Sequence, residues 1–99
     1  MDGLKFSWDA HKNTSNIKKH GISFDEAKTV FLDDDARLIS DPDHSDDEER
    51  FILLGYSHKP ELLTVCHCYM ESDDSIRIIP ARKAEKSERK IYESFRYEK

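Results

Sequence analysis

Lys19 and His20 are the first residues whose type and position suggest chemistry. They directly precede Gly21, and glycine fits the left-handed position that ends many helices. The C-terminal end of a helix favours positive charge, so both side chains would be held on a rigid corner of the protein. A titratable histidine held there suits acid–base chemistry or phosphate binding. Cations also stabilise helix ends without any further role, and the sequence leaves both interpretations open.

Arg77 and Arg82 place further positive charge on or beside a predicted strand. Arg77 alternates with Ile76 and Ile78, so its side chain leaves the face that the two isoleucines share. A partly buried arginine needs an anion or a carboxylate as its partner. A bound anion would make Arg77 functional, whereas a pair with Glu49 would make it structural.

Glu49, Arg50 and His67 complete the set of charged and acid–base side chains around the predicted sheet. Glu49 and Arg50 open one strand, and His67 lies in the strand expected beside that of Arg77. Each of them is equally consistent with a solvated side chain on a half-exposed sheet.

Other catalytic chemistries lack the residues that they need. Cys66, His67 and Cys68 alternate along a predicted strand, so His67 points away from both sulfurs, and zinc sites usually take ligand pairs from turns. The three glycines are scattered, which disfavours a phosphate-binding loop. No serine or cysteine has the strand–turn–helix setting of an activated nucleophile. We therefore expect neither a metal site nor a cofactor.

Two helices are expected before the sheet. The first spans about Asp9–Lys19 with Asp9 as its N-cap, and the second spans about Phe24–Leu32. Ser23 lies three residues before Glu26, the spacing at which two side chains cap a helix start reciprocally. A helix end and a new helix start therefore lie within a few residues of each other.

Strands and one more helix are expected in the rest of the chain. Turn signals separate four strands and a final helix, which span about Ala36–Ser40, Arg50–Ser57, Leu62–Met70, Ser75–Pro80 and Ala84–Phe95. Pro80 ends the last strand because proline cannot donate to the ladder. Short connections predict antiparallel pairing. The pattern predicts an α+β fold with two N-terminal helices, an antiparallel sheet of about four strands and one C-terminal helix.

Composition bounds the class of protein. Ninety-nine residues with 36% hydrophobic content predict a single domain over residues 1–99. The chain has no apolar run that could span a membrane and no leader, and its two cysteines lie too close together for a useful disulfide. A soluble cytoplasmic protein is expected.

Charge is segregated along the chain. The net charge is −5, and residues 33–49 hold nine acidic side chains, whereas residues 82–99 hold seven lysines and arginines against four glutamates. A basic patch attracts phosphate even when the total charge is negative. The acidic run suits a basic partner protein, or simply keeps a loop solvated.

Several strings together resemble one protein family, the BrnT toxins. The N-terminal strings are Trp8-Asp9, Asn16-Ile17-Lys18-Lys19-His20-Gly21-Ile22-Ser23-Phe24 and Glu26-Ala27. The later ones are Asp41-Pro42-Asp43-His44-Ser45, Glu49-Arg50, Gly55, Arg77-Ile78-Ile79, Ala81-Arg82 and Glu88-Arg89 with Tyr92. They are collinear from Lys5 to about Glu93, and the strings around His20 and Arg77 are specific in combination.

The resemblance implies a ribonuclease toxin of a bacterial type II toxin–antitoxin system. Such a toxin has a compact fold similar to that of the RelE ribonucleases, cleaves RNA to stop translation and needs no metal. Its antitoxin would be of the BrnA type, a DNA-binding protein that wraps the toxin. The complex would contact operator DNA only through that antitoxin.

The resemblance also suggests catalytic roles. Metal-independent RNA cleavage needs a base for the 2′-hydroxyl, an acid for the leaving oxygen, and cations for the charge that develops on the phosphate. Arg77 and Arg82 would stabilise that charge, and Glu49 or His20 would be the base or the acid.

Four further residues would bind the RNA in this scheme. Arg50, Lys19 and Lys83 would position its backbone, Arg50 within the catalytic group. Tyr92 would stack on a base or, given its helical spacing with Phe95, pack in the core.

Two positions near Arg82 depart from the family pattern. Pro80 stands where the family usually has serine, and Glu85 stands where a threonine usually caps the last helix. The main alternative is therefore a catalytically inactive relative that serves as a protein-binding module or co-repressor with its antitoxin. A DNA-binding regulator is disfavoured because no helix pair ends in a recognition helix.

Overall fold

The structure is a computed structural model, which describes residues 4–40, 50–72 and 74–97. The elements follow one another as β1 (Phe6–Ser7), α1 (Ala10–His20), α2 (Phe24–Lys28), a 3-10 helix η1 (Thr29–Leu32), β2 (Arg37–Ser40), β3 (Phe51–Tyr56), β4 (Leu62–Met70), β5 (Ser75–Lys83) and α3 (Lys86–Tyr97). Glu49 and the string Asp41-Pro42-Asp43-His44-Ser45 lie outside the described residues.

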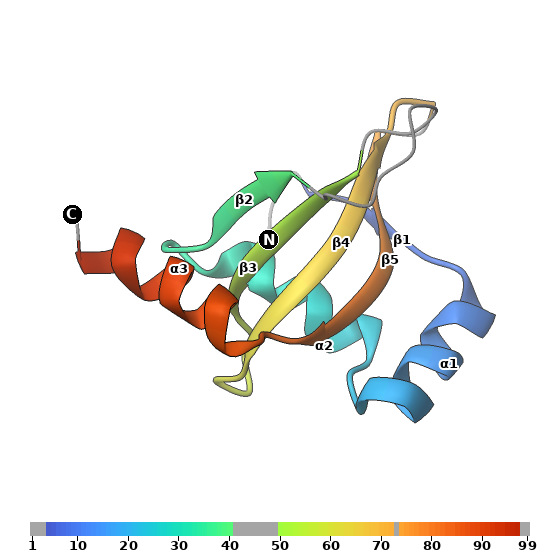
Figure 1. The fold of residues 1–99 in the computed structure, drawn as a ribbon. Helices are drawn as coiled ribbons and strands as arrows, with labels where there is room; N and C mark the ends of the chain where they lie inside the picture. Colours follow the sequence, from blue (N-terminus) through green and yellow to red (C-terminus); the bar gives the residue numbers. More distant parts are fainter. Residues whose placement is uncertain (1–3, 41–49, 73, 98–99) are drawn as a thin grey trace.

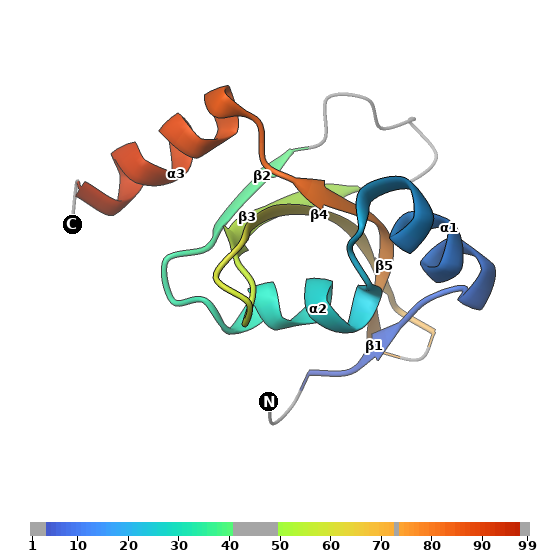
Figure 2. The same ribbon diagram turned by 90° about the horizontal axis from the view of Figure 1, so that it is seen from below.

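The strands form one curved sheet in the order β1-β5-β4-β3-β2 (Figure 1). β2, β3, β4 and β5 pair antiparallel, as the short connections predict. The sequence does not predict β1, which pairs parallel with β5 through only two residues, Phe6 and Ser7. Figure 2 shows α2 under one face of the sheet and α3 projecting from its other side. The predicted α+β class is confirmed.

The corner between α1 and α2 is built as its residue types predict. Asp9 caps α1 by accepting the backbone N–H of His11 at 2.8 Å, and Gly21 ends the helix with a φ of 72°. Ser23 starts α2 by accepting the backbone N–H of Glu26 at 3.1 Å. These local interactions define where α1 begins and ends and where α2 begins, and they thereby set the position of His20 at the end of α1.

Glu26 departs from the predicted reciprocal cap, because its carboxylate is used elsewhere. Its side chain is 4% exposed, accepts a hydrogen bond from the Ser57 hydroxyl at 2.8 Å and lies 4.0 Å from the Lys59 ammonium. A buried carboxylate needs such partners, and the loop after β3 supplies them. The predicted helix Phe24–Leu32 has the right extent, but its second half is the 3-10 helix η1.

Two apolar clusters lie on opposite faces of the sheet. The larger one fills the space between the sheet and α2 and contains Ile22, Phe24, Ala27, Val30, Leu53, Leu63, Val65, Ile78 and Ala81. The smaller one lies beneath α3 and contains Leu54, Leu62 and Tyr92. α3 therefore covers only one part of its face of the sheet.

Asp33 belongs to the packed body and not to a solvated acidic loop. Its Oδ2 accepts the Tyr92 hydroxyl at 2.7 Å and the backbone N–H of Tyr56 at 2.9 Å. A Cβ on Gly55 would lie 3.0 Å from the same carboxylate oxygen, so glycine is needed for this close approach. Asp33, the first residue of the acidic run, therefore has a structural role.

β5 continues through Pro80 to Lys83, which corrects the prediction that the proline ends the strand. Val65 pairs with Ala81 and His67 with Ile78, so one residue of β4 faces two residues of β5, Ile79 and Pro80. This arrangement is a β-bulge, where a residue without an N–H donor costs no ladder bond. The bulge also changes which side chains reach the open face of the sheet.

His67 lies on the core face, away from both cysteine neighbours. It is 7% exposed, its ring centroid lies 5.0 Å from that of Phe31, and its Nδ1 lies 3.1 Å from the carbonyl oxygen of Val65. Cys66 faces the opposite side, as strand alternation predicts. Burial lowers the pKa of His67, because a cation in this apolar setting is disfavoured.

We expect the stability of the protein to fall more steeply on acidification than that of His67→Phe. The pKa of His67 lies below its ordinary value of 6.5 only in the folded state, so the unfolded chain holds more protons at intermediate pH. The neutral His67 side chain makes its full contribution to the free energy of unfolding above pH 6.5. That contribution decreases as the pH falls below 6.5, and the decrease stops once the pH is below the pKa of the folded state. Its slope is at most about 1.4 kcal/mol per pH unit. Urea unfolding at a series of pH values measures it, and parallel curves for the two proteins would contradict it.

Candidate active site

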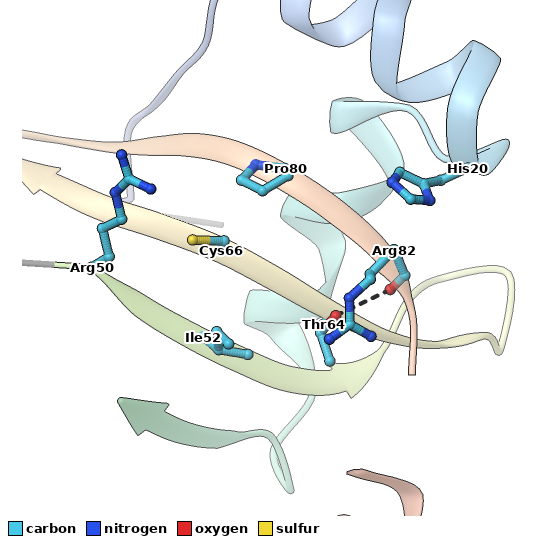
Figure 3. Close-up of a pocket in the computed structure, with 7 residues that line it drawn as sticks. All are labelled: His20, Arg50, Ile52, Thr64, Cys66, Pro80 and Arg82. Atoms are coloured by element: carbon cyan, nitrogen blue, oxygen red, sulfur yellow. Dashed lines mark hydrogen bonds between the residues drawn. The ribbon is translucent and has the colours of Figure 1, made fainter. Parts of the chain in front are cut away.

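A pocket of about 200 Å³ opens on the sheet face opposite α2, between the end of α1 and the strands β3, β4 and β5. Its lining residues are His20, Arg50, Ile52, Thr64, Cys66, Pro80 and Arg82 (Figure 3). Arg50 lies at one end of the pocket, His20 and Arg82 lie at the other, and apolar side chains lie between them. A cavity of this volume has room for several water molecules.

A second pocket of about 250 Å³ adjoins the first and shares His20 and Pro80 with it. Its other lining residues are Lys12, Ser15, Asn16, Lys19 and Ile79. We call the two pockets together the basic groove. Among the described residues that line it, four carry a positive charge (Lys12, Lys19, Arg50 and Arg82) and none carries a negative one. Such a groove attracts a polyanion although the whole chain is acidic.

Strand register explains why these side chains share one face. Thr64 of β4 pairs with Arg82 of β5, and Cys66 lies two residues further along the same face of β4. Cys68, two residues beyond that, pairs with Arg77. Arg77 is half-buried and projects from the groove's face of the sheet, one row past the residues that line the pockets. Ile78 is 1% exposed in the core, so the predicted divergence of Arg77 from its neighbours is confirmed.

Arg82 is held by a carboxylate that the sequence does not assign to the site. Its Nη1 and Nη2 donate to the two oxygens of Glu88 in α3, each at 2.9 Å. The hydrogen bonds that Arg82 donates to Glu88 raise the pKa of Arg82 further above its ordinary value. Burial alone would raise the pKa of Glu88, but the bonds from Arg82 and from the backbone N–H of Glu85 lower it overall. Both groups therefore stay ionised at neutral pH.

Asn16 attaches the helix that carries His20 to the strand that carries Arg82. It is 6% exposed, and its Nδ2 donates to the carbonyl oxygens of Ile22 and Ala81, each at 2.8 Å. Its Oδ1 accepts the backbone N–H of Ala81 at 3.1 Å. The side-chain amide thus bonds both backbone groups of Ala81, as a neighbouring strand would. The sequence marks Asn16 only as part of the string that precedes His20.

Replacing Asn16 with alanine is expected to lower the free energy of unfolding by about 2–4 kcal/mol. The substitution removes three buried hydrogen bonds and takes the side-chain partner away from both backbone groups of Ala81. Thr14→Ala is the matched control, because Thr14 is exposed on the same helix and bonds only within it. Urea unfolding of both variants measures the effect, and equal stabilities would contradict the role of Asn16.

Two residues predicted for the site, Lys83 and Tyr92, do not line the basic groove. Lys83 pairs with the core residue Leu63, so it leaves the strand on the side opposite to Arg82 and lies 3.9 Å from Glu61. Tyr92 is 2% exposed, so its ring offers no free face to a base, and the core-packing alternative is the one observed. Glu49 lies outside the described residues. His20, Lys19, Arg50 and Arg82 do line the groove.

Within residues 4–40, 50–72 and 74–97, no three His, Cys, Asp or Glu side chains come together in a way that would hold a metal ion. None of the helices in this part of the chain is long and apolar enough to cross a membrane.

Comparisons with known proteins agree with the fold and with the resemblance of the sequence strings. A family model described as "Ribonuclease toxin, BrnT, of type II toxin-antitoxin system" matches residues 8–88. The 1.1 Å crystal structure of the Brucella abortus ribonuclease toxin BrnT superposes with a TM-score of 0.63 at 24% sequence identity. The match covers 84% of this chain and 99% of the Brucella chain. A comparison with curated proteins finds no match.

Proposed function

Because this chain belongs to the BrnT family of ribonuclease toxins from type II toxin–antitoxin systems, we propose that it cleaves RNA in the basic groove without using a metal ion. We also propose that this cleavage inhibits translation and that the protein acts in the cytoplasm.

The observation that carries this proposal is the convergence of His20, Arg50 and Arg82 on one pocket. The three residues come from the end of α1, from the position just before β3 and from the last residues of β5, and they surround a floor formed by Ile52 and Cys66. A cationic wall binds a phosphate, and a histidine beside it supplies the proton transfer that metal-free phosphodiester cleavage requires.

The reaction needs only groups that the groove offers. A base removes the proton of the RNA 2′-hydroxyl, whose oxygen attacks the adjacent phosphorus while the 5′-oxygen leaves and takes up a proton. His20 is the described residue suited to one of these transfers, and Glu49 is the candidate for the other. Arg82 and Arg50 stabilise the negative charge on the phosphate, and Arg77 adds positive charge further along the same face of the sheet.

Lys19 and Lys12 extend the positive surface along α1, where the backbone of the RNA would continue. The family implies an antitoxin as protein partner, and we propose an antitoxin of the BrnA type. In this proposal operator DNA is contacted only through the antitoxin. The acidic run, apart from Asp33, is a candidate surface for that partner.

The proposal is tested by inducing the chain alone in bacteria, beside Arg82→Ala at matched soluble yield, and examining growth and total RNA in the same samples. Growth arrest with RNA breakdown in the parent only is the expected result. Cleavage of RNA by the purified protein in excess EDTA tests metal independence, because a metal-dependent nuclease would stop.

A soluble parent protein that neither arrests growth nor breaks RNA would contradict the proposal. It would favour a catalytically inactive relative that acts by binding its antitoxin. Cleavage that EDTA abolishes and added metal restores would retain the ribonuclease and reject metal independence.

A further inference from the structure

Arg82 and Glu88 form an end-on pair that leaves part of the guanidinium available. Nη1 and Nη2 each donate one N–H to Glu88 at 2.9 Å, and Nη1 also donates to the carbonyl oxygen of Lys83 at 3.2 Å. An arginine has five N–H donors, of which this accounts for three. The other two, on Nε and Nη2, lie parallel on one edge and have no acceptor among the described residues.

The available edge has the geometry that binds a phosphate. Two parallel N–H groups of one guanidinium match two oxygens of a phosphate, and such bidentate contacts are stronger and better oriented than single ones. Arg82 lines the first pocket beside His20. A phosphate can therefore bind the free edge while the pair with Glu88 stays intact.

Glu88 is itself held in a fixed position. Its side chain is 14% exposed, and Oε1 also accepts the backbone N–H of Glu85 at 2.8 Å. This bond closes the first turn of α3, where a residue at the third helical position reaches back to the N-cap residue. The orientation of the guanidinium thus depends on the start of α3.

We propose that Glu88 is a positioning residue for RNA cleavage, which fixes Arg82 so that its Nε and Nη2 edge faces the scissile phosphate. This inference rests on the proposed function. It assigns Glu88 no contact with the RNA. Without the carboxylate, Arg82 keeps its charge but samples many rotamers, and the bidentate geometry is rarely present when the substrate binds.

A double-mutant cycle tests the inference, using the full chain and the variants Glu88→Gln, Arg82→Ala and the pair of them. Glu88→Gln is expected to lower the rate constant for cleavage of bound RNA about tenfold or more, with less than a threefold change in RNA affinity. In the Arg82→Ala background the same substitution is expected to have no further effect. Glu61→Gln is the matched control, since Glu61 pairs with Lys83 on the opposite face.

Two outcomes of the cycle overturn the inference. Activity of Glu88→Gln equal to or above that of the parent would make Glu88 a spectator or a competitor of the phosphate. An equal loss in both backgrounds would show that Glu88 acts only on the stability of α3 and not through Arg82.

Titration with inorganic phosphate separates the inference from the proposed function, because it needs no cleavage. The NMR signal of the Arg82 Nε–H is expected to shift with phosphate in the parent, and Glu88→Gln is expected to need at least about fivefold more phosphate. A parent that binds phosphate in this way but cuts no RNA would reject the proposed function alone. A parent whose Nε–H signal ignores phosphate would reject the inference.

Discussion

Replacing Arg82 with alanine is expected to lower the rate constant for cleavage of bound RNA by about 10²–10³-fold. The guanidinium lines the pocket with two parallel donors available, and loss of one preorganised donor to a developing oxyanion has this magnitude in enzymes. Arg82→Lys is expected to lose at least tenfold as well, since an ammonium restores the charge but not the planar fork. Single-turnover cleavage of a short labelled RNA at saturating protein measures both effects.

Lys83→Ala is the matched control for this experiment. Lys83 is the next residue on the same strand, but it leaves the sheet on the other side and pairs with Glu61. We expect its cleavage rate to stay within twofold of the parent. Arg82→Ala also leaves Glu88 without its partner, so its unfolding curve is measured beside the cleavage rate. A folded Arg82→Ala that cleaves within threefold of the parent would contradict the assignment of Arg82.

The helix boundaries could be predicted because the interactions that set them are local. Asp9 and Ser23 bond backbone groups two or three residues away, and Gly21 needs only its own freedom to adopt a positive φ. Each signal is complete within one helical turn of sequence. The corner that carries His20 is therefore readable without knowledge of the rest of the fold.

The features that could not be predicted depend on residues far apart in the chain. β1 becomes a strand only because β5, about seventy residues later, offers it an edge. Pro80 lies within a strand because a bulge opposite Cys66 requires no donor there. The role of Asn16 is set by the backbone of Ala81 across the molecule. No local pattern encodes any of these partners.

The sequence predicted which types of residue form the candidate site better than it predicted which individual residues line it. His20, Arg50 and Arg82 do meet, although they come from three elements. Of the described residues in the basic C-terminal run, Arg82 alone lines the groove, and strand alternation sends its neighbour Lys83 to the other face of the sheet. In the sequence, Glu88 is one of four glutamates among the basic residues and part of the Glu88-Arg89 string, and neither pattern assigns it to the site. Its value lies in the pairing with Arg82, which charge counting cannot detect.

Replacing His20 with alanine is expected to lower the rate constant for cleavage of bound RNA by about 10²–10⁴-fold, the range found when a general acid or base is removed. RNA affinity is expected to change much less, because the lysines and arginines of the groove supply the attraction to phosphate. The same single-turnover assay separates the two quantities. Residual cleavage would still yield a 2′,3′-cyclic phosphate, since the attacking group belongs to the RNA.

His11→Ala is the control for this prediction, because His11 is exposed at the start of α1 and lines neither pocket. We expect it to cleave RNA at the parent rate. If His20→Ala instead lost affinity in proportion to its activity, His20 would act as a phosphate-binding cation at the helix end. If it kept full activity, proton transfer would have to come from a group outside the described pocket, and Glu49, next to Arg50, would become the first residue to replace.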